Sequence, residues 1–383
     1  MSHSPSSLSE LTELVRQWHQ DSTPWIPSGQ GRHLHWGPPL NLNHSVLSCR
    51  QLKRVIDHAV DDLTITVEAG LELNALQALL AERNQWLPID TPRDGQPSSI
   101  GGLVARGLAG GLRHRHLGVR DQIIGIGLMR SDGITAKAGG RVVKNVAGYD
   151  LMRLLCGSWG SLALITQLTL RLKPISPFSG LLIMRGTLEH QDRFRAALMQ
   201  SSLTPDRCDW QQKGDGSWRL RLLINSINTQ AVDDQLKLLE HLAERHDLIH
   251  ERAESQQPYD TGMAPQTGQW LVRLVLPPAN LHQLLSSEAM GRLPGWHWDL
   301  AAGSGCGDGW STTVTPAPRV RELRQELTRL GGWLSVLQQP ESSAIEAWLD
   351  APARPLMEAV KRQFDPKLQL CRGRLPGVHQ PTA

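Results

Sequence analysis

Alternating and helical patterns of apolar residues predict a mixed helix and strand structure for the first half of the chain. A capping box from Ser7 to Glu10 predicts the start of an amphipathic helix that reaches about Trp18. The β-branched run Thr64–Glu68 predicts a strand, and the Ser-Asp-Gly turn at 131–133 predicts a hairpin. The other expected elements are a strand and glycine-rich loop over 25–37, a strand just before 64, a helix over 71–84 and a strand over 162–174.

After Pro177 the pattern changes. From about Gly180 the order is strand, helix, strand, strand, helix, strand, and a similar order returns from Gln269. This is the order of a ferredoxin-like unit, so we expect two such units to form a large antiparallel sheet backed by helices. In the second unit we expect strands over 296–302 and 310–315 on either side of a turn at 303–310, and the tail predicts a helix followed by a loop.

Composition narrows the class of protein. The chain has 383 residues, enough for two or three domains, and its net charge of +3 does not indicate a nucleic-acid partner. Five cysteines without a CxxC pair argue against a disulfide framework and against an iron–sulfur cluster held by this chain alone. With no apolar signal region and no stretch of ~20 apolar residues, we expect a protein of the cytoplasm, or one held at the inner membrane through partners.

Thirteen tryptophans are many beside two tyrosines and three phenylalanines. They follow no repeat, so we interpret them as packing and interface residues. Trp296, Trp298 and Trp310, on neighbouring expected strands, are candidates for the core of a partner interface, since tryptophan is enriched at binding hot spots.

Three glycine-rich segments, at 28–37, 98–111 and 139–161, all lie in the first half. Exposed N–H groups at glycine turns bind anions, and a missing Cβ lets the backbone approach a ligand. Three such segments suit a long ligand with a diphosphate in its middle. The chain has no GxxxxGK[ST] loop, and Gly29-x-Gly31 lacks the third glycine of a Rossmann fingerprint. From the residues alone, a set of tight turns in a β-rich domain remains the alternative.

The run from Val67 to Pro174 resembles the FAD-binding domain of the vanillyl-alcohol oxidase / p-cresol methylhydroxylase (PCMH) family. Within that family, "GGRVVKNVAGYDLMRLLCGSWGSL" and "GVRDQIIGIGL" resemble the E subunits of bacterial glycolate dehydrogenases (glycolate oxidases). The closing "FDPKLQLCRGRLPG" is similar to the family's FDP…NPGR stretch. The resemblance implies an α+β fold with a PCMH-type FAD-binding domain of two α/β subdomains over 1–176, an antiparallel substrate-side cap over 177–342, and a helix and tail over 343–383 that return to the first domain.

The resemblance also implies which residues hold FAD. The loop after the first strand would cover the diphosphate, "SSIGG" would form a second cradle, "HLGVRD" would lie along the dinucleotide, and the strand through Ile165 would edge the adenine. The implied residues are Gly29, Gln30, Gly31, Arg32, Ser99, Gly101, Gly102, His116, Gly118, Asp121, Lys144, Gly148 and Ile165. We further expect Asp150 to cap the helix that follows it. Gly157 and Gly160 are expected to let the next turn pack against the Ile165 strand. The role of Tyr149 stays open between ligand contact and packing.

The sequence departs from the family pattern at several positions. Arg32 and His33 replace a small hydroxyl residue and a lysine, and Cys371 and Arg372 replace Asn and Pro in the closing stretch. We expect noncovalent FAD, although some family members attach flavin through a histidine near the position of His33. The later histidines form no H-x-H cluster with an acidic ligand, so no metal site is expected, and no catalytic residue is assigned.

The resemblance therefore implies an FAD-binding subunit of a glycolate dehydrogenase complex that oxidises glycolate to glyoxylate. A sister FAD catalytic subunit would carry out the oxidation, an iron–sulfur subunit would receive electrons, and this chain would act in electron relay or assembly. Two alternatives stay open: a self-sufficient FAD-dependent 2-hydroxy-acid dehydrogenase, and a non-catalytic scaffold without flavin.

Overall fold

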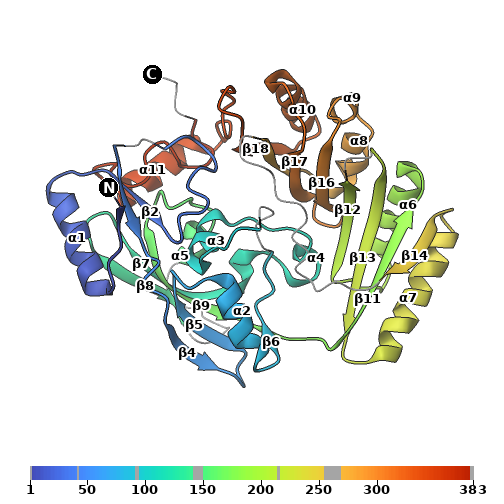
Figure 1. Ribbon diagram of the computed structural model, residues 1–383, viewed down its shortest axis with the longest axis horizontal. Coiled ribbons are helices and arrows are strands. Elements are labelled where there is room, and N and C mark those ends of the chain that lie inside the picture. Colours follow the sequence, from blue (N-terminus) through green and yellow to red (C-terminus); the bar gives the residue numbers. More distant parts are fainter. Residues whose placement is uncertain are drawn as a thin grey trace.

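The computed structural model describes residues 2–40, 43–90, 95–140, 150–213, 216–253 and 269–379. The chain forms two halves, each built around an antiparallel sheet, and α4 (Arg113–His116) lies between them (Figure 1). This arrangement confirms the predicted α+β class. Among the described residues, no helix is both long enough and apolar enough to cross a membrane.

The first half contains a five-stranded sheet in the described part of the chain, with the order β4-β5-β9-β7-β8. Its strands are β4 (Val55–Ala59), β5 (Thr64–Glu68), β7 (Ile123–Met129), β8 (Thr135–Gly139) and β9 (Leu164–Arg171). The accompanying helices are α2 (Leu73–Ala81), α3 (Ile100–Arg106), η1 (Val119–Gln122) and α5 (Leu151–Leu155), and β6 (Gln85–Trp86) pairs with β10 (Lys173–Pro174). The predicted Thr64–Glu68 strand and the 131–133 hairpin are both confirmed.

A smaller subdomain precedes this sheet. Strands β1 (Ser2–His3), β3 (Ser45–Ser48) and β2 (Trp25–Ser28) pair in parallel, and α1 (Leu8–Gln20) packs against them. Ser7 Oγ accepts the N–H of Glu10, so the predicted helix start is confirmed. The Glu10 carboxylate accepts the N–H of Ser6 at 2.9 Å, one residue earlier than a capping box requires.

The second half is one antiparallel sheet of eight strands within the described residues, with the order β14-β11-β13-β12-β16-β17-β15-β18. Each set of four strands follows the ferredoxin-like order, and the two units join where β12 pairs with β16. The strands are β11 (Phe178–Arg185), β12 (Arg207–Lys213), β13 (Trp218–Ser226), β14 (Ile249–Ala253), β15 (Leu271–Val275), β16 (Trp296–Ala301), β17 (Cys306–Ser311) and β18 (Trp333–Gln338). The helices are α6 (Leu188–Gln200), α7 (Thr229–Glu244), η2 (Pro278–Asn280), α8 (Leu281–Leu285), α9 (Glu288–Gly291) and α10 (Ala317–Arg329), and the apolar core lies between them and the sheet.

Two expectations for the second unit are wrong. The turn covers only 302–305, and most of the expected 303–310 turn is strand β17 itself. Its glycines allow close packing, because a Cβ on Gly309 would lie 2.1 Å from the Trp298 ring. The tryptophans expected at a partner interface are also inside the chain: Trp296, Trp298 and Trp310 are 0%, 1% and 4% exposed.

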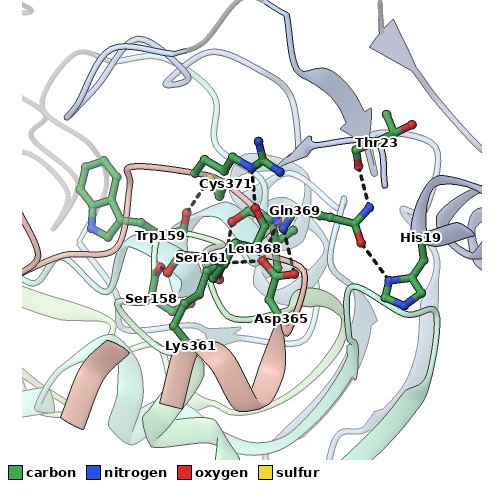
Figure 2. A network of polar contacts seen from close by, with 12 residues as sticks. His19, Thr23, Ser158, Trp159, Ser161, Lys361, Asp365, Leu368, Gln369 and Cys371 are labelled. Carbon is green, nitrogen blue, oxygen red and sulfur yellow. Dashed lines mark hydrogen bonds and ion pairs between the residues drawn. The ribbon is translucent and has the colours of Figure 1, made fainter. Parts of the chain in front are cut away.

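The C-terminal segment packs back onto the first half. Helix α11 (Arg354–Phe364) places Lys361 Nζ 2.6 Å from Asp365 Oδ2, 2.6 Å from Ser161 O and 2.7 Å from Leu370 O (Figure 2). Asp365 also accepts the N–H groups of Gln369 and Leu370. Burial of the Asp365 carboxyl favours its neutral form, but the charge of Lys361 and these hydrogen bonds outweigh burial and hold its pKa below the ordinary value.

Gln369 extends this network to the N-terminal subdomain. Its Nε2 donates to Trp18 O at 2.8 Å and to Thr23 O at 2.9 Å, and its Oε1 lies 2.9 Å from His19 Nδ1 (Figure 2). One buried ion pair therefore connects α11, the turn before β9 and the N-terminal subdomain.

We predict that Asp365→Asn strongly destabilises the protein. Breaking a buried ion pair by removing one partner costs about 3–5 kcal/mol, because the other charge stays buried without compensation. Thermal unfolding should show a melting temperature several degrees lower. Glu358→Gln is the matched control, since its pair with Arg354 on the same helix is partly exposed and should contribute little.

The same carboxylate should set part of the acid dependence of stability. Because the pKa of Asp365 is depressed in the folded state, its contribution is present above the unfolded aspartate pKa of about 3.9 and is lost as the pH falls through the lower folded value. The melting temperature of Asp365→Asn should therefore fall less steeply below pH 4 than that of the wild type. Parallel curves for the two proteins would contradict this assignment.

Candidate functional site

A cavity of about 120 Å³ lies where the N-terminal subdomain, the five-stranded sheet and the C-terminal loop meet. Four segments form its wall: the end of β2 with the loop to Leu34, the turn into α3, the segment from Trp159 into β9, and the loop that carries Cys371 and Arg374. Of the residues implied by the family resemblance, the cavity wall contains Gly29, Gln30, Gly31, Arg32, Ser99, Gly101, Gly102 and Ile165.

The loop after β2 presents backbone donors. Within the described residues, the N–H groups of Gly29, Gln30, Gly31 and Arg32 make no hydrogen bond. Gly31 has φ +80°, a left-handed conformation that favours glycine. Successive N–H groups in such a turn form a concavity for an anion.

The shape of this loop is fixed from its other side. Ser48 Oγ donates to Gly29 O at 2.9 Å, and Gln30 Nε2 donates to Gly70 O at 3.2 Å. A Cβ on Gly29 would lie 1.9 Å from Ser99 Oγ, so the loop is in close contact with the turn into α3. The donors are thus held in place before any ligand arrives.

Three N–H groups of the turn into α3 are already used, including those of the two glycines that the sequence indicated as donors. Ile100 donates to Leu71 O at 2.8 Å, Gly101 to Ala69 O at 2.8 Å, and Gly102 to Ser99 Oγ at 3.2 Å. The glycines of this turn instead allow close packing and leave space beside the cavity. A Cβ on Gly101 would lie 2.7 Å from Ala69 Cβ, whereas a Cβ on Gly102 would meet only Ser99 Oγ, at 3.1 Å, beside the cavity.

Basic side chains surround the inner part of the cavity. Arg106 Nη2 donates to Ser98 Oγ at 2.8 Å, and its guanidinium lies 5.2 Å from the centre of the Trp36 ring. Arg374 donates from Nη1 to Leu34 O at 2.7 Å and from Nη2 to Trp36 O. Burial lowers the pKa of the Arg374 guanidinium. Sequence reasoning assigned no role to either arginine, although Arg374 belongs to the closing stretch that resembles the family.

Two cysteines and a histidine also line the cavity. Burial raises the pKa of Cys49 to about 12 and raises that of Cys371, so both are neutral thiols. His33 Nδ1 lies 3.3 Å from Ser98 Oγ, and its ring contacts the Trp36 ring edge to face at 4.4 Å. No thiolate is therefore available at the cavity from these two cysteines.

Several implied residues lie elsewhere. His116 Nε2 pairs with Asp206 Oδ1 at 2.9 Å and so connects α4 to the start of β12, while Gly118 donates its N–H to Asp121 Oδ2 at 2.9 Å. None of these residues is in the cavity wall. Lys144, Gly148 and Tyr149 lie outside the described residues.

The structure of the segment from Asp150 to Gly160 confirms one of the features that the sequence predicted. Asp150 Oδ1 accepts the N–H of Arg153 at 3.1 Å, so its predicted capping of α5 is confirmed. Gly157 and Gly160 have positive φ, but a Cβ on Gly160 would lie 2.6 Å from Pro27 Cγ. The Gly160 turn thus packs closely against β2.

The side of the eight-stranded sheet that faces the first half carries paired charges. Arg207 pairs with Asp209 at 2.8 Å, and Arg273 pairs with Asp308 at 3.0 Å. Asp90, from the first half, accepts the N–H of Gly110 at 2.6 Å and lies 4.0 Å from Arg207. Asp90, Arg273 and Asp308 border a small cavity of about 30 Å³. Nowhere in the described ranges do three or more histidine, cysteine, aspartate or glutamate residues form a group that could hold a metal ion.

The first part of the chain matches a family of known proteins. Residues 3–139 match the family described as "FAD binding domain". The chain is 35% identical over 164 residues to the glycolate oxidase subunit GlcE of Escherichia coli, covering 43% of this chain and 46% of that protein. It is 32% identical over 171 residues to a probable mitochondrial D-lactate dehydrogenase of Danio rerio, covering 44% and 34%. It is 30% identical over 171 residues to the glycolate oxidase subunit GlcD of Bacillus subtilis, covering 44% and 36%.

These matches span less than half the length of the curated relatives. Among solved structures, an alkyldihydroxyacetonephosphate synthase superposes with a TM-score of 0.72 at 14% identity, covering 96% of this chain and 75% of that one. That likeness concerns the fold of both halves, including the large antiparallel sheet. Residues 3–139 therefore match an FAD-binding domain, and a large antiparallel sheet follows this segment.

Proposed function

We propose that the chain is an FAD-binding subunit of a glycolate dehydrogenase complex and acts in electron relay or assembly. Its partners would be a sister FAD subunit that oxidises glycolate to glyoxylate and an iron–sulfur subunit that receives the electrons. The complex would reside in the cytoplasm or at the inner membrane. The observation that carries the FAD part is the run of four backbone donors from Gly29 to Arg32 on the cavity wall, inside a segment that matches an FAD-binding domain.

The cavity residues suit FAD in chemical type. The N–H groups of the Gly29–Arg32 loop would hold the diphosphate, with Arg32 at its exposed edge. Gly102 would leave room beside the ligand, and β9 would border it at Ile165. Bound FAD would supply an acceptor and donor of electrons, while the protein would position it and tune its potential. His116, Gly118 and Asp121 would support this site from outside the cavity wall.

The charges on the sheet favour relay or assembly over turnover by this chain. Oxidation of a 2-hydroxy acid needs a positioned base and a cation for the carboxylate. On the sheet face toward the first half, Arg273 is paired with Asp308 and Arg207 with Asp209, and Arg207 also lies 4.0 Å from Asp90. The likeness to a subunit named GlcE supports membership of a complex.

A self-sufficient FAD-dependent 2-hydroxy-acid dehydrogenase is the second candidate. Its support is that D-lactate dehydrogenases match nearly the same share of the chain as the glycolate oxidase subunits do. The third candidate function is a scaffold without flavin. This function does not account for the N–H groups without an acceptor at Gly29–Arg32.

We predict that the purified chain contains noncovalent FAD. It should show flavin absorption bands, and acid precipitation should release the flavin into the supernatant, because the cysteines on the cavity wall are neutral thiols and His33 is engaged with Ser98. Flavin that stays with the pellet would exclude the noncovalent mode. No flavin, even after reconstitution with FAD, would favour the scaffold.

We predict that Gly102→Val greatly reduces FAD retention and leaves the fold intact. The added side chain would meet only Ser99 Oγ within the protein and would extend beside the cavity. Flavin content per chain and the melting temperature should be measured together. Gly291→Val is the matched control, since a Cβ on this helical glycine would point into open space and the residue does not line the cavity.

Gly101→Val is a poorer test than Gly102→Val. Its side chain would collide with Ala69, including the carbonyl oxygen at 2.9 Å, so loss of FAD could follow from misfolding. Full FAD retention by Gly102→Val would show that the second cradle is misplaced.

We predict that the isolated chain does not oxidise glycolate at a useful rate, yet the assembled complex requires it. The assay uses glycolate with an artificial electron acceptor, first on the FAD-loaded chain and then on the complex with and without it. Robust turnover by the chain alone would favour the self-sufficient dehydrogenase. Full activity of the complex without the chain would refute both relay and assembly.

A further inference from the structure

Arg374 differs from the other buried arginine and lysine side chains in the described residues. It is 4% exposed, and no carboxylate pairs with it in this part of the chain. The other buried arginines and lysines each have an acidic partner: Arg195 with Asp192, Arg207 with Asp209, Arg273 with Asp308, Arg324 with Glu346, and Lys361 with Asp365. A buried charge without a partner is costly, so a site that keeps one is expected to receive an anionic group.

The hydrogen bonds of Arg374 leave its buried Nε–H without an acceptor in the described part of the chain. Nη1 and Nη2 donate to the carbonyls of Leu34 and Trp36, whereas the buried Nε–H has no acceptor among the described residues. The guanidinium carbon lies 5.8 Å from the centre of the Trp159 ring. Because Arg374 is part of the cavity wall, its charge acts on whatever occupies the cavity.

The loop that carries Arg374 is held independently of any ligand. Lys361 bonds Leu370 O and Ser161 O, and Cys371 donates its N–H to Trp25 O at 2.9 Å (Figure 2). The Sγ of Cys371 also lies 3.5 Å from Trp159 O. The arginine is therefore positioned in advance, so little ordering is needed when an anion binds.

The position of Arg374 favours the redox ring over the diphosphate. The diphosphate has its own donors at Gly29–Arg32. Arg374 bonds the carbonyls of Leu34 and Trp36, and Trp36 packs with Trp310 of the sheet and lines the small cavity between the halves. If the isoalloxazine ring of FAD lies beside Arg374, that end of the ligand points toward the second half of the chain.

We propose that Arg374 supplies the positive charge that stabilises the reduced, anionic ring of bound flavin and so raises its reduction potential. This inference rests on the proposed FAD binding. Two-electron reduction with uptake of one proton leaves a negative charge on the ring, and a nearby buried cation stabilises that form more than the neutral oxidised form. Arg374 is thus a residue that tunes the cofactor, with no bond made or broken by its side chain.

The test compares the full chain with Arg374→Gln, using FAD as the ligand. Flavin content and FAD affinity are measured first, and the midpoint potential of the bound flavin is then measured by equilibration with reference dyes. We expect Arg374→Gln to shift the potential to a more negative value. Arg372→Gln is the matched control, because it removes the same charge from an exposed residue of the same loop and should leave the potential unchanged.

Arg374→Met, which removes the charge but keeps a similar length, is the second variant if the first does not fold, and it should show the same shift. A wild-type potential in a charge-free variant would overturn the inference. A loss of FAD affinity with an unchanged potential would also overturn it and would assign Arg374 to the phosphates. Absence of flavin from the reconstituted wild-type chain would refute the proposed FAD binding itself, and the inference with it.

Discussion

The buried ion pair between Lys361 and Asp365 is the constraint on which the candidate site depends. Lys361 joins three parts of the chain by bonding Asp365, Ser161 O and Leu370 O. Through these contacts the C-terminal loop closes a cavity whose opposite wall is built more than three hundred residues earlier, by the loop at Gly29. A flavin cavity of this kind cannot be completed by the first half alone, because Cys371 and Arg374 belong to its wall.

The two glycine-rich segments on the cavity wall have different roles. The Gly29–Arg32 loop keeps its backbone donors available and is fixed through its carbonyl and the Gln30 side chain. The turn into α3 uses the N–H groups of Ile100, Gly101 and Gly102 internally. It contributes shape, since Gly101 fits against Ala69 and Gly102 leaves space. The Gly29–Arg32 loop thus supplies hydrogen-bond donors, and the turn into α3 supplies space for a ligand. On the sheet side, paired charges lie at the boundary between the halves.

The sequence predicted what local patterns determine. The Thr64–Glu68 strand, the 131–133 hairpin, the Asp150 cap and both ferredoxin-like units follow from periodicity and turn chemistry. The predictions from the sequence were wrong where contacts between residues distant in the chain determine the structure. The N–H of Gly101 donates to Ala69 O, and Gly309 in β17 leaves room for the Trp298 ring. The role of Arg374 is visible only when burial and the absence of an acidic partner in the described residues are known together.

The central claim is that the backbone of the Gly29–Arg32 loop holds the diphosphate of FAD. A crystal structure of the full chain grown with FAD tests it most directly. The account predicts phosphate oxygens within hydrogen-bond distance, about 2.7–3.2 Å, of the N–H groups of this loop, with the ring on the Arg374 side of the cavity. A diphosphate bound elsewhere on the chain, while this loop keeps its conformation and its N–H groups stay without an acceptor, would contradict the account.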